Sequence, residues 1–206
     1  MSTAEKRDYH SVESYLEFLD KSEFPFEYVN GYLRAMSAPT VRHNLVASNA
    51  LIAFGTKLKG SMCRAFNSDS MVRIRRGAST WLYYPDASII CESNGQTERF
   101  QDQPNVVVEV LSPSTRAIDL DEKVNNYLTI ESLQMYLILE QHEPYVVLFR
   151  RTPEGFLRES IEGIDRSVPF TFLGFTIPMA DLYDGVDFTL AAVREEEQLY
   201  GANNER

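Results

Sequence analysis

Glu109 is the residue of this sequence whose surroundings most demand a chemical explanation. It lies inside Val106–Leu111, a nearly continuous apolar run that is typical of a strand covered on both faces. An ionised carboxylate is costly to bury, so it is usually paired with a cation or bound to a metal. Glu109 could instead face solvent at a strand end or pair with an arginine. The apolar run continues past it, which favours a compensated, buried carboxylate.

Asp86 is a second carboxylate placed at the start of an apolar segment. It follows Pro85 and precedes Ala87–Ile90, and proline is tolerated at the first position of a strand but not in its centre. A Pro-Asp pair alone is a weak signal, because turns contain it frequently. Together with Glu109 on a neighbouring strand it predicts two converging carboxylates, which suit a hard divalent cation such as Mg²⁺ or Mn²⁺.

These residues resemble a known motif. Tyr84-Pro85-Asp86 and Val108-Glu109-Val110-Leu111 look like the PD-(D/E)XK motif of restriction-endonuclease-like nucleases. More narrowly, the chain from residue 24 to 140 resembles one large bacterial family of restriction-endonuclease-like proteins. The matching segments, of which the third is the most specific, are Phe26–Gly31, Pro85-Asp86, Val107–Thr115, and Lys123 with Tyr127.

The resemblance implies a fold and a site. The fold would be α/β: a mixed β-sheet flanked by helices, with an N-terminal helix and hairpin and extra C-terminal strands. Asp86, Glu109 and the backbone carbonyl of Val110 would hold Mg²⁺ or Mn²⁺.

The sequence departs from the superfamily motif at Leu111, where a lysine is expected. In the resembled family the lysine is displaced to the following helix, and Lys123 is the matching residue, with Tyr127 one turn further on the same face. A lysine side chain is long and flexible, so its ammonium can reach the same place from another backbone position. There it would orient the attacking water or stabilise charge. Lys123 could instead be an exposed helix lysine paired with Asp119 or Glu122.

Four further residues are candidates for the site. Glu27, which precedes a predicted hairpin turn, could be a third metal or water ligand, or a solvent-facing residue. His43 could contact phosphate or a water beside the metal, or be a core or capping histidine. Arg73 and Arg75 lie on one face of a predicted strand in the densest basic patch, which suits phosphate contacts or an ordinary solvated face. Ser112 and Ser114 have no histidine at a suggestive spacing, which argues against a serine nucleophile.

Periodicity and turn signals predict the elements that position these residues. A short helix begins at Ser11, Asn30-Gly31 forms a hairpin turn, and a helix covers residues 41–58. Asp119 is expected to cap a helix that runs to about Ile130, with Asp121 and Glu122 as acids in its first turn. The predicted strands cover residues 70–76, 82–91, 105–111, 135–140, 145–150, 156–161 and 170–177. A helix between residues 111 and 135 implies a parallel pair in a mixed sheet.

Length and composition limit the class of protein. The 206 residues, 44% hydrophobic, predict one domain over 1–206 with a polar tail from about residue 189. The net charge of −10 argues against a protein that coats nucleic acid, but not against an enzyme that meets phosphates through a metal. Cys63 and Cys91 form no C-x-x-C pair and are expected to be free thiols in a reducing cytosol. No signal peptide or apolar run long enough to span a membrane is present, so a cytoplasmic location is expected.

Two functions of different classes follow. The first is metal-dependent phosphodiester hydrolysis, with the protein acting as a DNA endonuclease, and the resemblance makes a homodimer a candidate assembly. The alternative is a non-catalytic module on the same fold that binds protein or nucleic acid, which Leu111 and the acidic charge favour. A different metal-dependent hydrolase using the same carboxylates is a third possibility.

Overall fold

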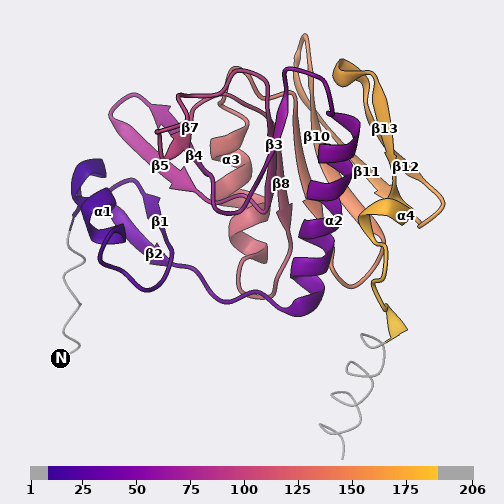
Figure 1. Ribbon diagram of the computed structural model, residues 1–206, viewed down its shortest axis with the longest axis horizontal. Coiled ribbons are helices and arrows are strands. Elements are labelled where there is room, and N and C mark those ends of the chain that lie inside the picture. The colour runs from indigo at the N-terminus through magenta and orange to yellow at the C-terminus, as the bar shows by residue number, and fades with distance from the viewer. Residues whose placement is uncertain (1–8, 190–206) are drawn as a thin grey trace, which may run out of the picture.

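A six-stranded mixed sheet runs through the middle of the protein, of which the computed structural model describes residues 9–189 (Figure 1). Strands β8 and β9 are parallel and every other neighbouring pair is antiparallel. The parallel pair confirms the prediction of a mixed sheet, because a helical segment connects β8 to β9. In spatial order the strands are β11 (Gly155–Glu162), β10 (Tyr145–Thr152), β9 (Met135–Leu139), β8 (Pro104–Val110), β6 (Ala87–Ile90) and β3 (Arg64–Asn67).

Different elements cover the two faces of this sheet. One face packs against α2 (Val41–Lys57) and the C-terminal segment, and it includes Val106, Val108 and Val110 of β8. The other face, which includes Val107, packs against α3 (Lys123–Tyr127). Because side chains alternate along a strand, Glu109 is directed to the α3 face. The C-terminal segment consists of β12 (Ser167–Phe170), β13 (Phe175–Pro178) and α4 (Met179–Leu182).

A second, five-stranded sheet carries the N-terminal hairpin. Its order is β2 (Tyr32–Ala35), β1 (Phe26–Val29), β5 (Ser79–Tyr83), β4 (Met71–Arg76) and β7 (Phe100–Gln101), and α1 (Val12–Leu19) packs beside β1. Asn30 and Gly31 have φ angles of 46° and 98°, which confirms the predicted turn. The hairpin register places Glu27 directly opposite Arg34.

The predicted single strand over residues 82–91 is wrong. The chain leaves the second sheet after Tyr83, passes through Tyr84-Pro85-Asp86 without strand pairing, and enters the central sheet as β6. Proline has no N–H to contribute to a ladder, so it suits this break. The Asp86 carboxylate accepts a hydrogen bond from the Val110 N–H at 2.7 Å. The Pro-Asp pair is therefore a junction between two sheets and brings Asp86 to the end of β8.

The predicted cap at Asp119 is also wrong. The chain is already helical from Arg116, and residues Ile118–Glu122 form a π-helical turn, η1, that continues into α3. Asp119 therefore lies within the helical segment and is buried. Acids that cap helices are usually exposed, so its burial requires another explanation. Residues 170–177 differ as well, because a 3₁₀ turn, η2 (Thr171–Leu173), divides them into the β12–β13 hairpin.

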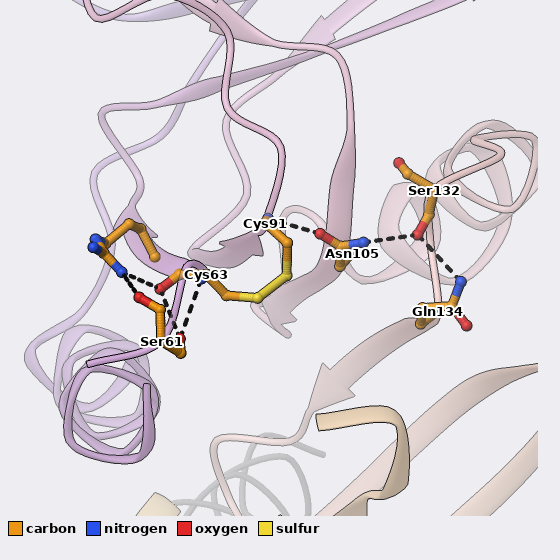
Figure 2. The surroundings of a disulfide bond; sticks show 7 residues. Ser61, Cys63, Cys91, Asn105, Ser132 and Gln134 are labelled. Carbon is orange, nitrogen blue, oxygen red and sulfur yellow. Dashed lines mark hydrogen bonds between the residues drawn. A yellow bond between two sulfur atoms is a disulfide. The ribbon is translucent and has the colours of Figure 1, made fainter. Parts of the chain in front are cut away.

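Cys63 and Cys91 form a disulfide, so the expectation of free thiols is wrong (Figure 2). Cys63 precedes β3 and Cys91 follows β6, and the pairing of Arg64 with Ile90 brings the two cysteines together. Asn105 accepts a hydrogen bond from the Cys91 N–H at 2.8 Å and donates one to the Ser132 carbonyl at 3.2 Å. The disulfide end of β6 is thus tied to β8 and to the chain that enters β9.

Two further sequence predictions concern the polar C-terminal tail and membrane-spanning segments. The polar tail predicted from about residue 189 falls on residues 190–206, which lie outside the described residues. Over residues 9–189 the structure has no helix with the length and apolar character needed to cross a membrane.

Candidate active site

Lys123 lies among three buried carboxylates in what we call the Lys123 cluster: Glu27, Glu109, Asp119, Lys123 and Tyr127. The Lys123 Nζ atom is 2.8 Å from Glu109 Oε1, 3.1 Å from Asp119 Oδ1 and 3.2 Å from Glu27 Oε1. The Tyr127 hydroxyl donates to Glu109 Oε1 at 3.1 Å. No member of the cluster is more than 5% exposed. Lys123 does pair with Asp119, one of the alternatives drawn from the sequence, but inside the protein rather than on its surface.

Three separate parts of the chain contribute to the Lys123 cluster. Glu27 comes from β1 and Glu109 from β8, while Asp119, Lys123 and Tyr127 follow one another at intervals of four in the η1–α3 segment. Residues four apart lie on one side of a helix, so these three side chains point the same way. The structure therefore brings together Glu27, Glu109, Lys123 and Tyr127.

Asp86 lies beside this cluster rather than inside it. Its Oδ2 atom accepts the Val110 N–H bond and lies 3.3 Å from Nε2 of His43, in the first turn of α2. Thr40 caps that helix, accepting from the His43 backbone N–H at 3.2 Å, which holds the first turn that carries His43. Burial lowers the pKa of His43, but the Asp86 carboxylate, the Val110 carbonyl and Asp119 raise it by more. His43 thus contacts Asp86 directly, and its ring is mostly buried.

The electrostatics of the Lys123 cluster are dominated by burial and by crowded acids. Burial raises the pKa of Glu109 well above its ordinary value; Lys123 opposes this, and Asp119, Asp86 and Glu27 reinforce it. The pKa of Asp119 is also raised, with burial as the main cause, although Lys123 and Thr115 oppose the rise. Burial lowers the pKa of Lys123, but Glu109, Glu27 and Asp119 raise it by more, to well above its ordinary value. Lys123 therefore stays protonated and acts as a positive charge, not as a proton acceptor.

Arg34 ties the hairpin to the helical segment and is a residue that sequence analysis missed. Its Nε and Nη2 atoms donate to Glu27 Oε2 at 3.0 and 2.7 Å, and Nη1 donates to both oxygens of Glu122 at 3.0 Å. The Tyr83 hydroxyl also donates to Glu122, at 2.7 Å. Arg34 thus holds Glu27 in place beside Lys123. The available signal was its position opposite Glu27 across the Asn30-Gly31 turn.

Asp119 is the other missed residue. It was assigned to a helix cap, although it stands four residues before Lys123, the spacing that places two side chains on one helix face. That spacing was the signal that could have identified it.

Arg73 and Arg75 are not brought into the Lys123 cluster. Arg73 donates to both oxygens of Asp102 at 2.7 Å, and the Nη2 atom of Arg75 lies 3.5 Å from Asp102 Oδ2. The guanidinium of Arg73 also lies over the Phe100 ring, 3.8 Å from its centroid. Arg73 and Arg75 lie on the same side of β4, as the alternation of strand side chains predicted. Both are paired with Asp102 of this chain.

The acids of the Lys123 cluster and Asp86 match a hard cation in donor type and in charge, but not in their arrangement. Among residues 9–189, no three His, Cys, Asp or Glu side chains are grouped, as they stand, so that they could hold an ion. The lysine ammonium instead neutralises part of the charge of three carboxylates, which outnumber it. Asp119 Oδ1 is buried, and the Lys123 ammonium lies 3.1 Å from it. Carboxylate oxygens of Asp86 and Glu109, with the Val110 carbonyl, are the ligand types that Mg²⁺ and Mn²⁺ prefer.

A hollow in the described part of the protein lies outside this site. It has a volume of about 730 Å³ and is lined by residues such as Phe66, Asn67, Tyr84 and Asn94, and by no member of the Lys123 cluster. Several of its polar side chains are already bonded within the protein; for example, Asn67 donates to Asp69 and Asn94 to Asp102. We therefore assign no substrate to it.

The mixed sheet, its crossover helix and the carboxylate–lysine cluster define a restriction-endonuclease-like α/β protein. The chain belongs to the Uma2 family, which is described as "Putative restriction endonuclease" and whose profile matches residues 12–180.

Its relatives include two uncharacterized proteins of Synechocystis sp. The protein slr1290 is 29% identical over 181 residues, which cover 86% of this chain and 93% of the relative. The protein sll1609 is 24% identical over 163 residues, covering 77% of this chain and 91% of the relative. A crystal structure from Anabaena variabilis, described as a "putative nuclease belonging to DUF820", superposes with a TM-score of 0.66 at 21% identity. It covers 84% of this chain and 97% of its own, and it supports the fold.

Proposed function

We propose that this protein hydrolyses phosphodiester bonds in DNA with Mg²⁺ or Mn²⁺ as its cofactor. One observation carries the proposal: the Lys123 ammonium is 2.8 Å from Glu109, and the Asp86 carboxylate binds the N–H of Val110, the next residue. Lys123 is thus paired with one of the two acids that the sequence singled out, and the other acid contacts the backbone beside it at the end of β8. The family description and the structural neighbour support nuclease chemistry.

Each residue has a distinct role in this proposal. Asp86, Glu109 and the Val110 carbonyl would hold the cation. When bound, a divalent cation supplies Lewis acidity, lowering the pKa of water and offsetting phosphate charge. Lys123, which stays protonated, would bind a phosphate oxygen or orient the attacking water. Glu27 and Tyr127 would hold Lys123 and Glu109 in place, and His43 would orient Asp86.

The net charge of −10 shapes how DNA would be bound. Arg73 and Arg75 both have Asp102 as an acid partner, so part of their charge is offset within the protein. Binding would then depend on the cation and on a few local contacts rather than on broad electrostatic attraction. Weak binding without a divalent cation is the expected consequence.

Cleavage of supercoiled plasmid in Mg²⁺ or Mn²⁺ tests the proposal. We expect nicking or linearisation by the wild-type protein and a loss of at least about 100-fold in Glu109→Gln and in Asp86→Asn, because each removes one negative charge from the proposed ligands. Glu131→Gln, at an exposed position near the end of the same helical segment, is the matched control and should cleave normally. Full activity in both site variants would refute the assignment of the site.

A non-catalytic binding module remains the rival function, because two observations favour it. The Lys123 ammonium already occupies the space between the acids and offsets part of their charge, and Leu111 replaces the motif lysine. Calorimetric titration with Mn²⁺ separates the two functions: a nuclease should bind the ion in the millimolar range or tighter, and the module should not. Dimerisation and a cytoplasmic location stay predictions; light scattering in solution would test the first.

A further inference from the structure

The parallel ladder between β8 and β9 continues into a side-chain contact beside the candidate active site. The Leu111 N–H donates to the Leu139 carbonyl at 2.8 Å. In a parallel pair the Leu111 carbonyl would next accept from the backbone N–H of Gln141. It accepts instead from Gln141 Nε2 at 2.8 Å, and the Gln141 backbone N–H donates to Glu140 Oε1 at 3.0 Å. The side-chain amide of Gln141 thus takes the place of a backbone N–H.

The oxygen of the same amide is bonded to the first turn of α2. Gln141 Oε1 accepts from the Thr40 hydroxyl at 3.1 Å, and Thr40 Oγ1 accepts from the His43 backbone N–H at 3.2 Å. His43 Nε2 lies 3.3 Å from Asp86 Oδ2, which also accepts from the Val110 N–H at the end of β8. Contacts therefore run from Gln141 to Asp86 along two routes, one through β8 and one through α2.

The burial of Gln141 indicates that both of its bonds matter. Gln141 is 2% exposed, whereas glutamine is mostly an exposed residue type. Burying an amide costs free energy unless its polar atoms are hydrogen-bonded, and here the nitrogen and the oxygen each have a partner. The bond to Leu111 alone would satisfy the end of the sheet. The bond to Thr40 goes further, because it joins that end of the sheet to α2.

We infer that Gln141 is a positioning residue for the candidate active site: its amide holds the end of β8 and the first turn of α2 together, so that both contacts of Asp86 keep their place. The effect on cleavage rests on the proposed function, and Gln141 acts through Leu111 and Thr40 rather than on the reacting atoms. The competing explanation is that Gln141 only satisfies the Leu111 carbonyl and stabilises the sheet.

Asn105 offers a matched control, because its amide bridges the sheet at the opposite end of β8. It accepts from the Cys91 N–H at 2.8 Å and donates to the Ser132 carbonyl at 3.2 Å. Gln141→Met and Asn105→Leu each remove one amide, keep a similar volume and leave backbone groups without their partner. The melting temperature should fall by a similar amount in both, about 5 °C. A difference between the variants at the active site then reflects position and not stability.

Amide hydrogen exchange of Val110, measured on the full chain, tests the inference without any cofactor. The Val110 N–H is bonded to Asp86, so it should exchange at least about 10-fold faster in Gln141→Met than in Asn105→Leu. In plasmid cleavage, kcat should be at least about 10-fold lower in Gln141→Met with KM unchanged, and Asn105→Leu should cleave normally. Thr40→Val should resemble Gln141→Met, whereas Thr40→Ser, which keeps the hydroxyl, should behave like the wild type.

Each other outcome has a definite meaning. Equal Val110 exchange in Gln141→Met and Asn105→Leu would make Gln141 a structural residue and overturn the inference. Faster exchange with an unchanged kcat would overturn it as well, because the site would not depend on the contact. If Gln141→Met does not fold, Thr40→Val and Thr40→Ser decide, and equal Val110 exchange in these two overturns the inference. A wild-type protein that cleaves no DNA would refute the proposed function, and Val110 exchange would still decide whether Gln141 positions Asp86.

Discussion

The Lys123 cluster and the Arg73–Asp102 pair are two groups of buried or half-buried charges with opposite balances. In the Lys123 cluster, three carboxylates share one ammonium. At Asp102, two guanidinium groups converge on one carboxylate, which also accepts from the Asn94 side chain at 3.0 Å. The first group has too little positive charge for its acids, and the second has enough.

The carboxyl pKa values reflect this difference. Burial and neighbouring acids raise the pKa of Glu109, despite the opposing charge of Lys123. Partial burial also raises the pKa of Asp102, but Arg73, Asn94 and Arg75 lower it by more, to below its ordinary value. Fully compensated pairs serve stability, whereas uncompensated buried acids are characteristic of functional sites. A functional site and a stabilising ion pair therefore differ in how many cations surround each carboxylate, not in whether charges are present.

Removal of the central ammonium should have the largest effect. Lys123→Met keeps much of the side-chain volume but leaves three carboxylates without their common cation, so we expect a loss of about 3 to 5 kcal/mol in the free energy of unfolding. Plasmid cleavage should fall by about 1000-fold or more, because the charge that acts on the phosphate or the water is gone. Urea denaturation and gel assays measure the two effects.

Lys57→Met, at an exposed position at the end of α2, is the control for Lys123→Met and should behave like the wild type. A Lys123→Met protein of unchanged stability would mean that the acids compensate one another without the lysine, and the contrast with Asp102 would be lost.

Loss of the disulfide should have an intermediate effect on stability alone. The Cys63–Cys91 bridge spans a sequence separation of 28 residues. Closing a loop of this length lowers the entropy of the unfolded chain, which stabilises the fold by about 3.6 kcal/mol. We expect the double variant Cys63→Ser, Cys91→Ser to unfold at lower urea concentration and to cleave DNA normally, because Asp86 and Cys91 lie at opposite ends of β6. Impaired cleavage in a folded double variant would show instead that the disulfide end of the sheet controls the site.

The smallest effect is expected at Asp102. A carboxyl group whose pKa is lowered by folding contributes stability above its unfolded pKa, near 3.8, and loses that contribution as the pH falls through the folded value. Asp102→Asn should therefore cost about 1 kcal/mol at pH 7, since the pair is partly screened by solvent, and the cost should shrink below pH 3.8. Urea denaturation at several pH values checks this. Asp20→Asn, which breaks the exposed pair with Arg99, is the control and should show little effect on stability. If the cost of Asp102→Asn grew at low pH, the stabilising role assigned to the Asp102 carboxylate would be contradicted.

Local sequence patterns predicted much of the fold. The Asn30-Gly31 turn, the helix over 41–58 and the apolar strand around Glu109 were recognisable because each depends on neighbours along the chain. The junction at Pro85-Asp86 was not recognised, because an extended segment that changes sheets has the same local pattern as one that stays in a single sheet. The disulfide was missed for a related reason: the β3–β6 register alone brings Cys63 and Cys91 together.

The candidate site likewise has features that the sequence predicted and features that only the tertiary structure revealed. The sequence by itself determined the types and order of Asp86, Glu109 and Lys123, and the apolar run made the burial of Glu109 predictable. Only the tertiary structure decided that Asp119 faces inward and that Arg34 holds Glu27, because both depend on contacts between segments far apart in the chain. Charge compensation is a three-dimensional property, since the free energy of a buried carboxylate depends on which cations lie within a few ångströms of it.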